Sequence, residues 1–409
     1  MREIKTKKRL TSNNLIKKII PPMQWFIKLE SSGGIVLLVA TVIALLIANS
    51  PLKGLYSFLL DYKIILWPEF EVLNKTVSFW VNDGLMVLFF FVVSLEIKRE
   101  ILYGELKSIK KTFLPVAAAL GGMLVPMTIY LAFNRSTHGA PGWGIPMATD
   151  IAFSIGILSI LGKRVPNSLK VFLTALAIID DIGAVIVIAI FYTSEISFLS
   201  LGIACFLVLI LVLINKAGIK NGYVYFILGV CLWLSFLSSG VHPTIAGVLL
   251  AFTIPAKRDP HVSFLHKTET KFHPYVVYLI MPVFAFANAG VNLGTGFVNN
   301  LTSSVSLGII FGLIFGKKIG ILLFSYLSVK LKLAALPKGV SWIQIYGVGW
   351  IAGIGFTMSL FIANLAFNGN SELLTEAKVG ILSASLIAGI IGYFVLRLLS
   401  INNPDKNTK

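Results

Sequence analysis

The chain has 409 residues, of which 56% are hydrophobic and only 13% are charged, and its mean hydropathy is +0.86. A soluble domain of this length does not carry so apolar a composition, so soluble enzymes and binding modules are excluded and a polytopic membrane protein is indicated. The formal net charge of +17 suggests nucleic acid at first sight, but the Lys and Arg residues lie between apolar runs, which is typical of a topology signal. We therefore expect the lipid bilayer as the surroundings of the chain and no nucleic-acid partner.

About twelve apolar runs are long enough to cross a bilayer as helices, which predicts an all-α integral membrane protein with one helical domain over residues 29–399. Residues 1–28 are basic and lack a convincing cleavage site, so we expect a cytoplasmic tail, at most interfacial, and no cleaved signal peptide. Residues 400–409 are expected to form a second cytoplasmic tail. The predicted spans are 29–50, 77–97, 113–133, 143–161, 168–192, 199–215, 222–237, 241–255, 272–289, 306–329, 342–367 and 377–399.

The basic residues test this map, because cytoplasmic loops are enriched in Lys and Arg. Most of the 35 basic residues fall into alternate gaps when the N-terminus is placed inside, which predicts cytoplasmic location of both termini. The longest outward gap, residues 51–76, contains an imperfectly alternating stretch. It either forms a small hairpin, whose edge can pair with a second subunit, or is a plain loop.

Two of the predicted spans are poor continuous helices. Residues 144–150 of the fourth span combine Gly and Pro with polar groups, and residues 347–355 of the eleventh span contain four glycines. Interrupted segments in corresponding halves are the best sequence indication of a transporter site, so we predict inverted-topology repeats made of spans three to five and ten to twelve. The alternative for the eleventh span is that its glycines only permit close helix packing.

Charged residues within or close to the hydrocarbon need a functional or structural reason, because each costs about 2.5–3.5 kcal/mol at the centre of a span. One alternative is an ion-pair network that only holds the helices together. The other is a site at which protons and a small cation compete for the same carboxylates. These residues are Asp83, Asp150, Asp180, Asp181, Lys317 and Lys318.

Competition at such a site would produce exchange of ions. Burial and a neighbouring Lys shift the pKa of a carboxylate in opposite directions, so the site can titrate near cytoplasmic pH. If it lies between two units that open alternately to either side, cations leave and protons enter. Because two carboxylates can release two protons for one monovalent cation, the exchange is expected to be electrogenic, as a hypothesis about a coupled pair.

Other membrane chemistries fit the sequence less well. An intramembrane aspartyl protease would need a GxGD-type sequence, a cation channel would usually obtain its symmetry from several subunits, and ATP-driven transport would need a phosphate-binding loop. We therefore expect a transporter and not an enzyme. Cys205 and Cys231 lie in apolar runs without metal-ligand spacing, and we interpret them as buried small hydrophobic residues.

Four motifs closely resemble the NhaA family of bacterial Na⁺/H⁺ antiporters: residues 148–153, 175–181, 284–290 and 353–359. The resemblance implies twelve helices in the bacterial inner membrane, with the fourth and eleventh unwound and crossing. It also implies pH-regulated export of Na⁺ or Li⁺ in exchange for protons, which serves sodium and pH homeostasis. No cofactor is implied beyond the transported ions, and a homodimer formed partly through the hairpin is expected.

Carried over by position, the resemblance assigns roles to named residues. Asp180 and Asp181 match the pair that binds the cation and the protons. Asp150 and Thr149 match groups at the helix crossing, Lys317 matches a lysine that compensates helix ends or pairs with Asp180, and Asp83 matches an acid toward the outward side. The pH response maps to Glu96, Arg99, Glu100, Glu269 and His273, for which ordinary solvated helix ends are the alternative.

Two positions, Lys318 and Thr270, depart from the family pattern, and His242 matches it. Lys318 stands where proline is frequent, which adds a charge beside Lys317, and Thr270 stands where a second ionisable residue can follow the acid of the pH cluster. His242 matches a family motif at a predicted outward turn, and a structural role is the favoured interpretation for its side chain.

Overall fold

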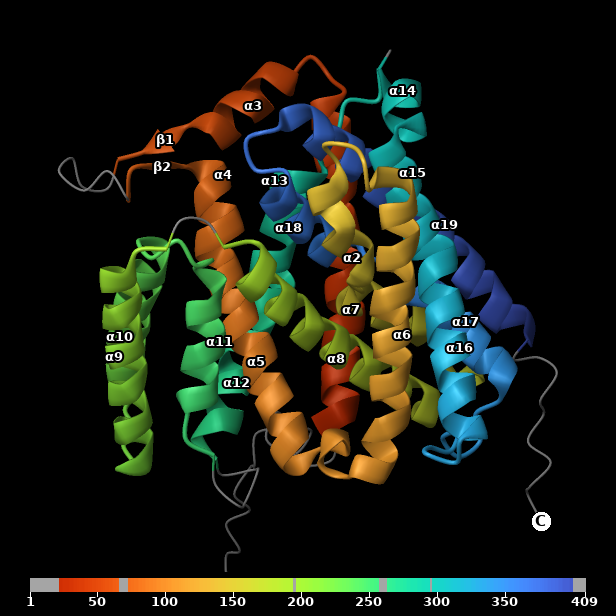
Figure 1. Cartoon of the computed structure of the whole chain (residues 1–409), viewed down its shortest axis with the longest axis horizontal. Coiled ribbons are helices and arrows are strands. Elements are labelled where there is room, and N and C mark those ends of the chain that lie inside the picture. The colour runs from red at the N-terminus through yellow and green to blue at the C-terminus, as the bar shows by residue number, and fades with distance from the viewer. Residues whose placement is uncertain (1–21, 66–72, 194–195, 257–262, 295, 400–409) are drawn as a thin grey trace, which may run out of the picture.

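The computed structural model describes residues 22–65, 73–193, 196–256, 263–294 and 296–399, and most of them are helical (Figure 1). The predicted tail at 400–409 and most of the one at 1–28 lie outside the described residues. The helices are α2 (Pro22–Ala48), α3 (Lys53–Asp61), α4 (Val77–Phe79), α5 (Met86–Tyr103), α6 (Ile109–Asn134), α7 (Ile151–Ile160), α8 (Asn167–Phe191), α9 (Phe198–Lys216), α10 (Gly222–Leu237), α11 (Thr244–Thr253), α12 (Phe264–Tyr275), α13 (Met281–Ala289), α14 (Phe297–Thr302), α15 (Ser304–Phe311), α16 (Lys317–Lys330), α17 (Trp342–Ile351), α18 (Phe356–Ala366) and α19 (Ser371–Leu399).

Short irregular helical turns join several of these elements. Turns of π-helix connect α4 to α5, α12 to α13 and α15 to α16, over Trp80–Leu85, Val276–Ile280 and Gly312–Gly316. Turns of 3₁₀-helix occupy Glu105–Lys107, Ala140–Met147 and Gly162–Arg164.

The predicted all-α membrane fold is confirmed. Within the described ranges eight helices are long and apolar enough to span a bilayer, or ten if each of two bent pairs counts as one span. The shorter apolar helices α10 and α11 complete the correspondence with the twelve predicted apolar runs. The fold is therefore that of a polytopic helical membrane protein.

Several helices begin earlier than the apolar runs predicted, and the differences are largest for α2 and α12. Helix α2 starts at Pro22 and not near residue 29, and α12 starts at Phe264 and not near residue 272. The first turns of α12 are rich in charged residues, and Ser263 caps its N-terminus with a hydroxyl that accepts a hydrogen bond from the backbone N–H of His266 at 3.1 Å. A hydropathy window cannot detect a polar extension of this kind.

The long outward gap contains a short helix and a two-stranded ribbon. Helix α3 turns away from α2 by 113°, and strand β1 (Lys63–Ile64) pairs antiparallel with β2 (Lys75–Thr76), in the register Lys63 opposite Thr76. Both strands lie at the upper left in Figure 1, outside the body of the helices. Residues 66–72, which join the strands, lie outside the described residues.

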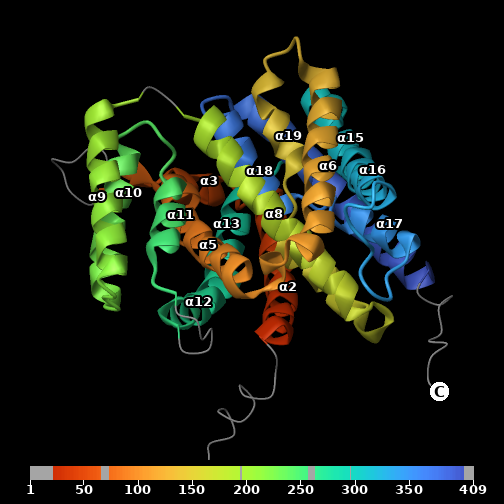
Figure 2. The same ribbon diagram turned by 60° about the horizontal axis from the view of Figure 1, so that its bottom comes forward.

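Helices α9 and α10 form a separate layer at one side of the molecule (Figure 2). Only 11% of the most apolar stretch of α9 is buried within the chain. Cys205 on α9 and Cys231 on α10 are free and exposed, so the prediction that they are buried is wrong. The reason is that an apolar run in a peripheral membrane helix can face lipid as well as protein.

The two predicted three-span units contain the same succession of elements, a first helix, an interrupted span and a long last helix. Helix α6 packs closely along α16, and the two run in opposite directions, since α6 rises in Figure 1 while the chain descends from α15 to α16. Each unit then continues into an interrupted span and a long closing helix, α8 or α19. This opposite course is the one expected for inverted repeats.

Two glycines permit the close approach of α6 and α16. A Cβ atom added to Gly121 would collide with the carbonyl oxygen of Gly320, and one added to Gly320 would collide with that of Gly121. Close contact between backbones is a main source of helix association in membranes. The two glycines therefore hold α16, which carries Lys317, against the first unit.

We expect Gly121→Ala to destabilise the protein by about 1–3 kcal/mol, the usual cost of forcing extra volume into a packed interface. The measurement is the thermal unfolding temperature of the purified protein in detergent. Gly202→Ala on α9 is the matched control, because a Cβ atom there meets none of the described residues within 4 Å. A Gly121→Ala protein that unfolds at the temperature of the Gly202→Ala protein would contradict the close approach.

Candidate functional site

The two interrupted spans meet at their breaks. The fourth span is unwound at residues 148–150, and the eleventh at residues 352–355, where α17 and α18 differ in direction by 48°. At the contact, the backbone N–H of Asp150 donates a hydrogen bond to the carbonyl oxygen of Ile354 at 2.6 Å. Backbone groups at a break lack a hydrogen-bond partner within their own helix. Here the two breaks pair such groups with each other, as a chain that spans a membrane requires.

Two serines complete this exchange in a reciprocal way. The hydroxyl of Ser154 on α7 donates to the carbonyl oxygen of Ile351, the last residue of α17, at 3.2 Å. The hydroxyl of Ser359 on α18 donates to the carbonyl oxygen of Ile145 in the other span at 2.7 Å. Each half-helix therefore donates a side-chain hydrogen bond to a backbone carbonyl of the opposite span.

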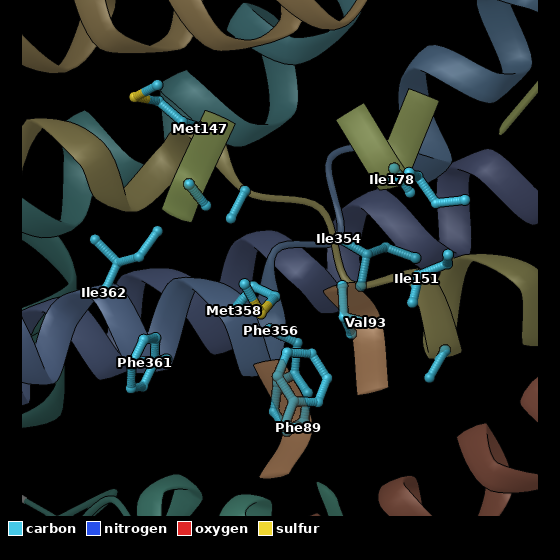
Figure 3. Close-up of a cluster of buried hydrophobic side chains, with 14 of the residues drawn as sticks. Phe89, Val93, Met147, Ile151, Ile178, Ile354, Phe356, Met358, Phe361 and Ile362 are labelled. Carbon is cyan, nitrogen blue, oxygen red and sulfur yellow. The ribbon is translucent and has the colours of Figure 1, made fainter. Parts of the chain in front are cut away.

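Apolar side chains enclose the crossing. Figure 3 shows Phe89 and Val93 of α5 close to Ile354 and Phe356 of the eleventh span, and all four are buried. Ionisable groups at the crossing are therefore shielded from water. Charges in such surroundings interact more strongly with one another than charges at a surface.

Asp150 caps two helices at once. Its Oδ1 atom accepts a hydrogen bond from the backbone N–H of Phe153 at 3.0 Å, in the first turn of α7. Its Oδ2 atom accepts from the backbone N–H of Thr357 at 3.0 Å, in the first turn of α18, and from the hydroxyl of the same residue. One carboxylate thus lies at the positive ends of both half-helices and offsets their partial charge.

Asp180 forms a buried ion pair with Lys317. The Nζ atom of Lys317 lies 2.5 Å from Oδ2 of Asp180, and both side chains are fully inaccessible to solvent. The hydroxyl of Thr149 lies 2.7 Å from the same oxygen and 2.9 Å from the carbonyl oxygen of Ala352. Thr149 therefore links the ion pair to the break in the eleventh span.

Asp181 lies beside this pair without sharing its bonds. It is 2% exposed and within electrostatic range of Asp180 and Asp150. The Oδ1 atoms of Asp180 and Asp181 are both buried and accept no hydrogen bond from the described residues. Two adjacent carboxylates thus each present an oxygen that a proton or a hard cation can bind.

In the described ranges no three His, Cys, Asp or Glu side chains gather closely enough to hold a metal ion among themselves. A cation at the Asp180 and Asp181 oxygens would therefore need further oxygen ligands from hydroxyl groups, backbone carbonyls or water.

Asp83 is not at the crossing. It lies in the π-helical turn that precedes α5, and its Oδ1 atom is 3.2 Å from Nε2 of His242. The Nδ1 atom of His242 lies 2.7 Å from the hydroxyl of Thr244. These contacts are consistent with a structural role for His242, which sequence reasoning had not paired with Asp83.

The five residues assigned to a pH response come together between α5 and α12. Arg99 forms ion pairs with Glu100 at 3.2 Å and with Glu269 at 3.0 Å, and Nδ1 of His273 lies 3.4 Å from Glu96. Glu96, Glu100, Glu269 and His273 are all buried, so the cluster differs from ordinary solvated helix ends. Asp83 and the α5 residues of this cluster, Glu96, Arg99 and Glu100, lie toward opposite ends of the same span, about 20–25 Å apart at 1.5 Å per residue.

Several polar residues that contact these sites were not predicted. Hydroxyl groups in the first turn after a glycine-rich break are a signal that could have identified Thr357 and Ser359 as partners of the opposite span. The other contacts lacked a local signal. They are His266, 4.0 Å from Glu269, and the chain of amides formed by Asn82, Asn288 and Asn364, joined at 2.7 and 2.9 Å.

Comparison with known proteins supplies the family. The model of the family described as Na⁺/H⁺ antiporter 1 matches residues 24–396. The chain is 52% identical over 373 residues to the Na⁺/H⁺ antiporter NhaA of Shewanella amazonensis, which covers 91% of this chain and 95% of the relative. It is 47% identical over 384 residues to the NhaA of Pelagibacter ubique, with 93% and 98% covered, and 47% identical over 401 residues to NhaA 1 of Clostridium beijerinckii, with 96% and 99% covered. The chain therefore belongs to the NhaA family of Na⁺/H⁺ antiporters.

Proposed function

We propose that this protein exports Na⁺ or Li⁺ in exchange for protons across the bacterial inner membrane, with Asp180 and Asp181 as the shared binding site. The observation that carries the proposal is the pair of buried carboxylates at a crossing of two broken helices, each with one oxygen that accepts no hydrogen bond from the described residues. The names of its relatives support the same ions. The protein would act as a secondary transporter and not as an enzyme.

The proposed exchange follows from competition. A proton on a carboxylate removes the charge that attracts Na⁺, and a bound Na⁺ occupies the oxygens that a proton needs. In the described arrangement the ammonium of Lys317 neutralises Asp180. An incoming cation must therefore displace the ammonium from Oδ2 of Asp180 or bind next to the ion pair. Two protons released for each monovalent cation would make the exchange electrogenic.

The broken spans suggest how the site would open alternately to either side. Contacts across the crossing are hydrogen bonds between short segments and not continuous helix packing, for example Asp150 to Ile354 and Thr149 to Ala352. Rocking of one unit against the other could rearrange these few contacts around a fixed site, the motion typical of inverted-repeat transporters.

The distribution of Lys and Arg supports cytoplasmic termini, because alternate gaps carry most of the positive charge. The β1 and β2 ribbon then lies on the opposite side of the membrane. A two-stranded ribbon has unpaired edges, and pairing of these edges between two copies would produce a homodimer.

The cluster between α5 and α12 is proposed to adjust transport to cytoplasmic pH. Histidine is the side chain whose charge most readily changes in the physiological range, and His273 on α12 contacts Glu96 on α5. A change of charge in the cluster would alter the attraction between α5 and α12, and Arg99 would carry this change from one helix to the other.

Glu269→Gln is expected to move the pH profile of exchange by about half a pH unit or more without abolishing transport, because it removes one charge from the Arg99 ion pair. The measurement is the initial rate of Na⁺-driven exchange between pH 6.5 and 9 in steps of about half a unit. Glu372→Gln, at an exposed position on α19, is the control. An unchanged profile in Glu269→Gln would remove the cluster from the proposed regulation.

The proposed function itself is tested in proteoliposomes that hold a pH gradient. Addition of Na⁺ or Li⁺ should dissipate the gradient, and addition of K⁺ should not. A membrane potential imposed with K⁺ and valinomycin should change the rate of Na⁺-driven exchange if the exchange is electrogenic. A gradient that withstands both Na⁺ and Li⁺ over the whole pH range would refute the proposal.

A further inference from the structure

Lys318 follows Lys317 on α16 but faces a different helix. Its Nζ atom lies 3.9 Å from the ring centroid of Trp350, 5.1 Å from that of Phe315 and 5.5 Å from that of Tyr346. Tyr346 and Trp350 lie one turn apart on α17, whereas Phe315 precedes α16 in the π-helical turn. The ammonium is therefore held among three aromatic faces, which we call the aromatic cage.

The cage takes the place of an acidic partner. Among the described residues Lys318 forms no ion pair, and attraction to aromatic rings is what offsets the charge of a partly buried ammonium. Trp350 is 8% exposed, and its indole N–H is buried without a hydrogen-bond acceptor in the described ranges. Because buried Trp residues usually pair this group, the position of Trp350 is better explained by its ring face against Lys318.

The backbone of α17 packs directly on the stem of Lys318. A Cβ atom added to Gly349 would lie 3.2 Å from the Cα atom of Lys318 and 3.4 Å from its Cγ atom. Gly349 and Trp350 belong to the last turn of α17, where the helix presents its negative end. A cation held at this turn is therefore favoured electrostatically as well as by the rings.

A continuous path of contacts leads from this turn to the carboxylate pair. The residue after α17 is Ala352, whose carbonyl oxygen lies 2.9 Å from the hydroxyl of Thr149. The same hydroxyl lies 2.7 Å from Asp180, which pairs with Lys317. The path therefore starts at Lys318 of α16 and returns to its neighbour Lys317.

We propose that Lys318 is a positioning residue for ion binding: through the aromatic cage it fixes the end of α17 to α16, and so sets where the Ala352 carbonyl meets Thr149 and Asp180. This inference rests on the proposed function, because its effect is read from Na⁺ binding during exchange. Lys317 then neutralises Asp180, while Lys318 holds the broken helix against the same element.

The test compares Lys318→Met, which keeps the apolar stem and removes the charge, with Lys318→Arg, which keeps the charge and stacks on aromatic rings. In proteoliposomes, Lys318→Met is expected to raise the half-saturating Na⁺ concentration about tenfold, equivalent to about 1.4 kcal/mol. The maximal rate should stay within about twofold, and Lys318→Arg should stay within about twofold in both quantities. Lys330→Met is the control, since Lys330 is an exposed lysine on the same helix, 5.9 Å from the ring of Tyr326.

If Lys318→Met does not fold, Tyr346→Leu removes one ring and leaves the charge, with an expected rise of about threefold in half-saturating Na⁺. An unchanged half-saturating concentration in the folded variant would overturn the inference, and so would a loss confined to the amount of folded protein. An equal rise in Lys318→Arg would also overturn it, because the effect would then be steric. Failure of the proposed function looks different, since the unmodified protein would then show no response to Na⁺.

Discussion

Asp181→Asn is expected to abolish Na⁺-driven exchange, with a loss of more than about 100-fold, while the protein remains folded. The amide has nearly the same shape as the carboxylate but can neither take up a proton near neutral pH nor offer a full negative charge to Na⁺. Asp181 forms none of the ion pairs of the crossing, so the substitution leaves the bond between Asp180 and Lys317 in place. The measurement is dissipation of a pH gradient by Na⁺ in proteoliposomes.

Asp180→Asn should abolish exchange to the same extent but should also reduce stability. Removal of the Asp180 charge leaves the ammonium of Lys317 buried without its partner, which typically costs about 3–5 kcal/mol. Thermal unfolding in detergent therefore distinguishes the two variants. Asp61→Asn, at an exposed position on α3, is the control for both measurements. Exchange at the unmodified rate in both variants would show that the site lies elsewhere.

Asp150→Ala is expected to destabilise the protein by about 1.5–5 kcal/mol and to reduce exchange strongly. The loss combines an N-cap, worth about 0.5–2 kcal/mol, with buried donors of a second helix that lose their acceptor, at about 1–3 kcal/mol. Both α7 and α18 are affected, because Phe153 and Thr357 donate to the same carboxylate. Thermal unfolding and exchange are measured on the same preparations.

A second cap in the chain provides the comparison. Asn221 caps α10 with an exposed side chain that accepts from the backbone N–H of Tyr223 at 3.0 Å, so Asn221→Ala should cost only about 1 kcal/mol. Asp150→Asn, which keeps an acceptor oxygen and loses the charge, should fall between the two alanine variants. If Asp150→Ala costs no more than Asn221→Ala, then Asp150 does not cap both half-helices.

The sequence predicts much of this fold because a membrane span can be recognised from its own residues alone. Each helix that crosses a bilayer needs a long apolar run, and a break inside such a run needs Gly, Pro or polar residues. Interruptions within 144–150 and 347–355 were therefore predicted from composition, and the observed breaks at 148–150 and 352–355 lie inside these ranges. The extension of α12 to Phe264 was missed because its residues are polar, and apolar periodicity is the only signal that such windows detect.

The contacts that build the site were predictable only in part. The identity of the acidic groups follows from the energetic cost of burying them, but Asp150 and Thr357 are 207 positions apart and no periodicity relates them. The surroundings of Lys318 are equally non-local, because Trp350 belongs to a different helix. The cost of a charge in the membrane therefore indicates that a partner exists and does not identify it.

Calorimetry on the purified protein tests the central claim most directly. NaCl is titrated into the protein near neutral pH in buffers of different ionisation enthalpy, which reports the number of protons released for each Na⁺ bound. Because the cation and the protons are proposed to occupy the same oxygens of Asp180 and Asp181, proton release should accompany Na⁺ binding and should disappear with binding in Asp181→Asn. Sodium binding without release of protons at any pH near neutrality would contradict the shared site.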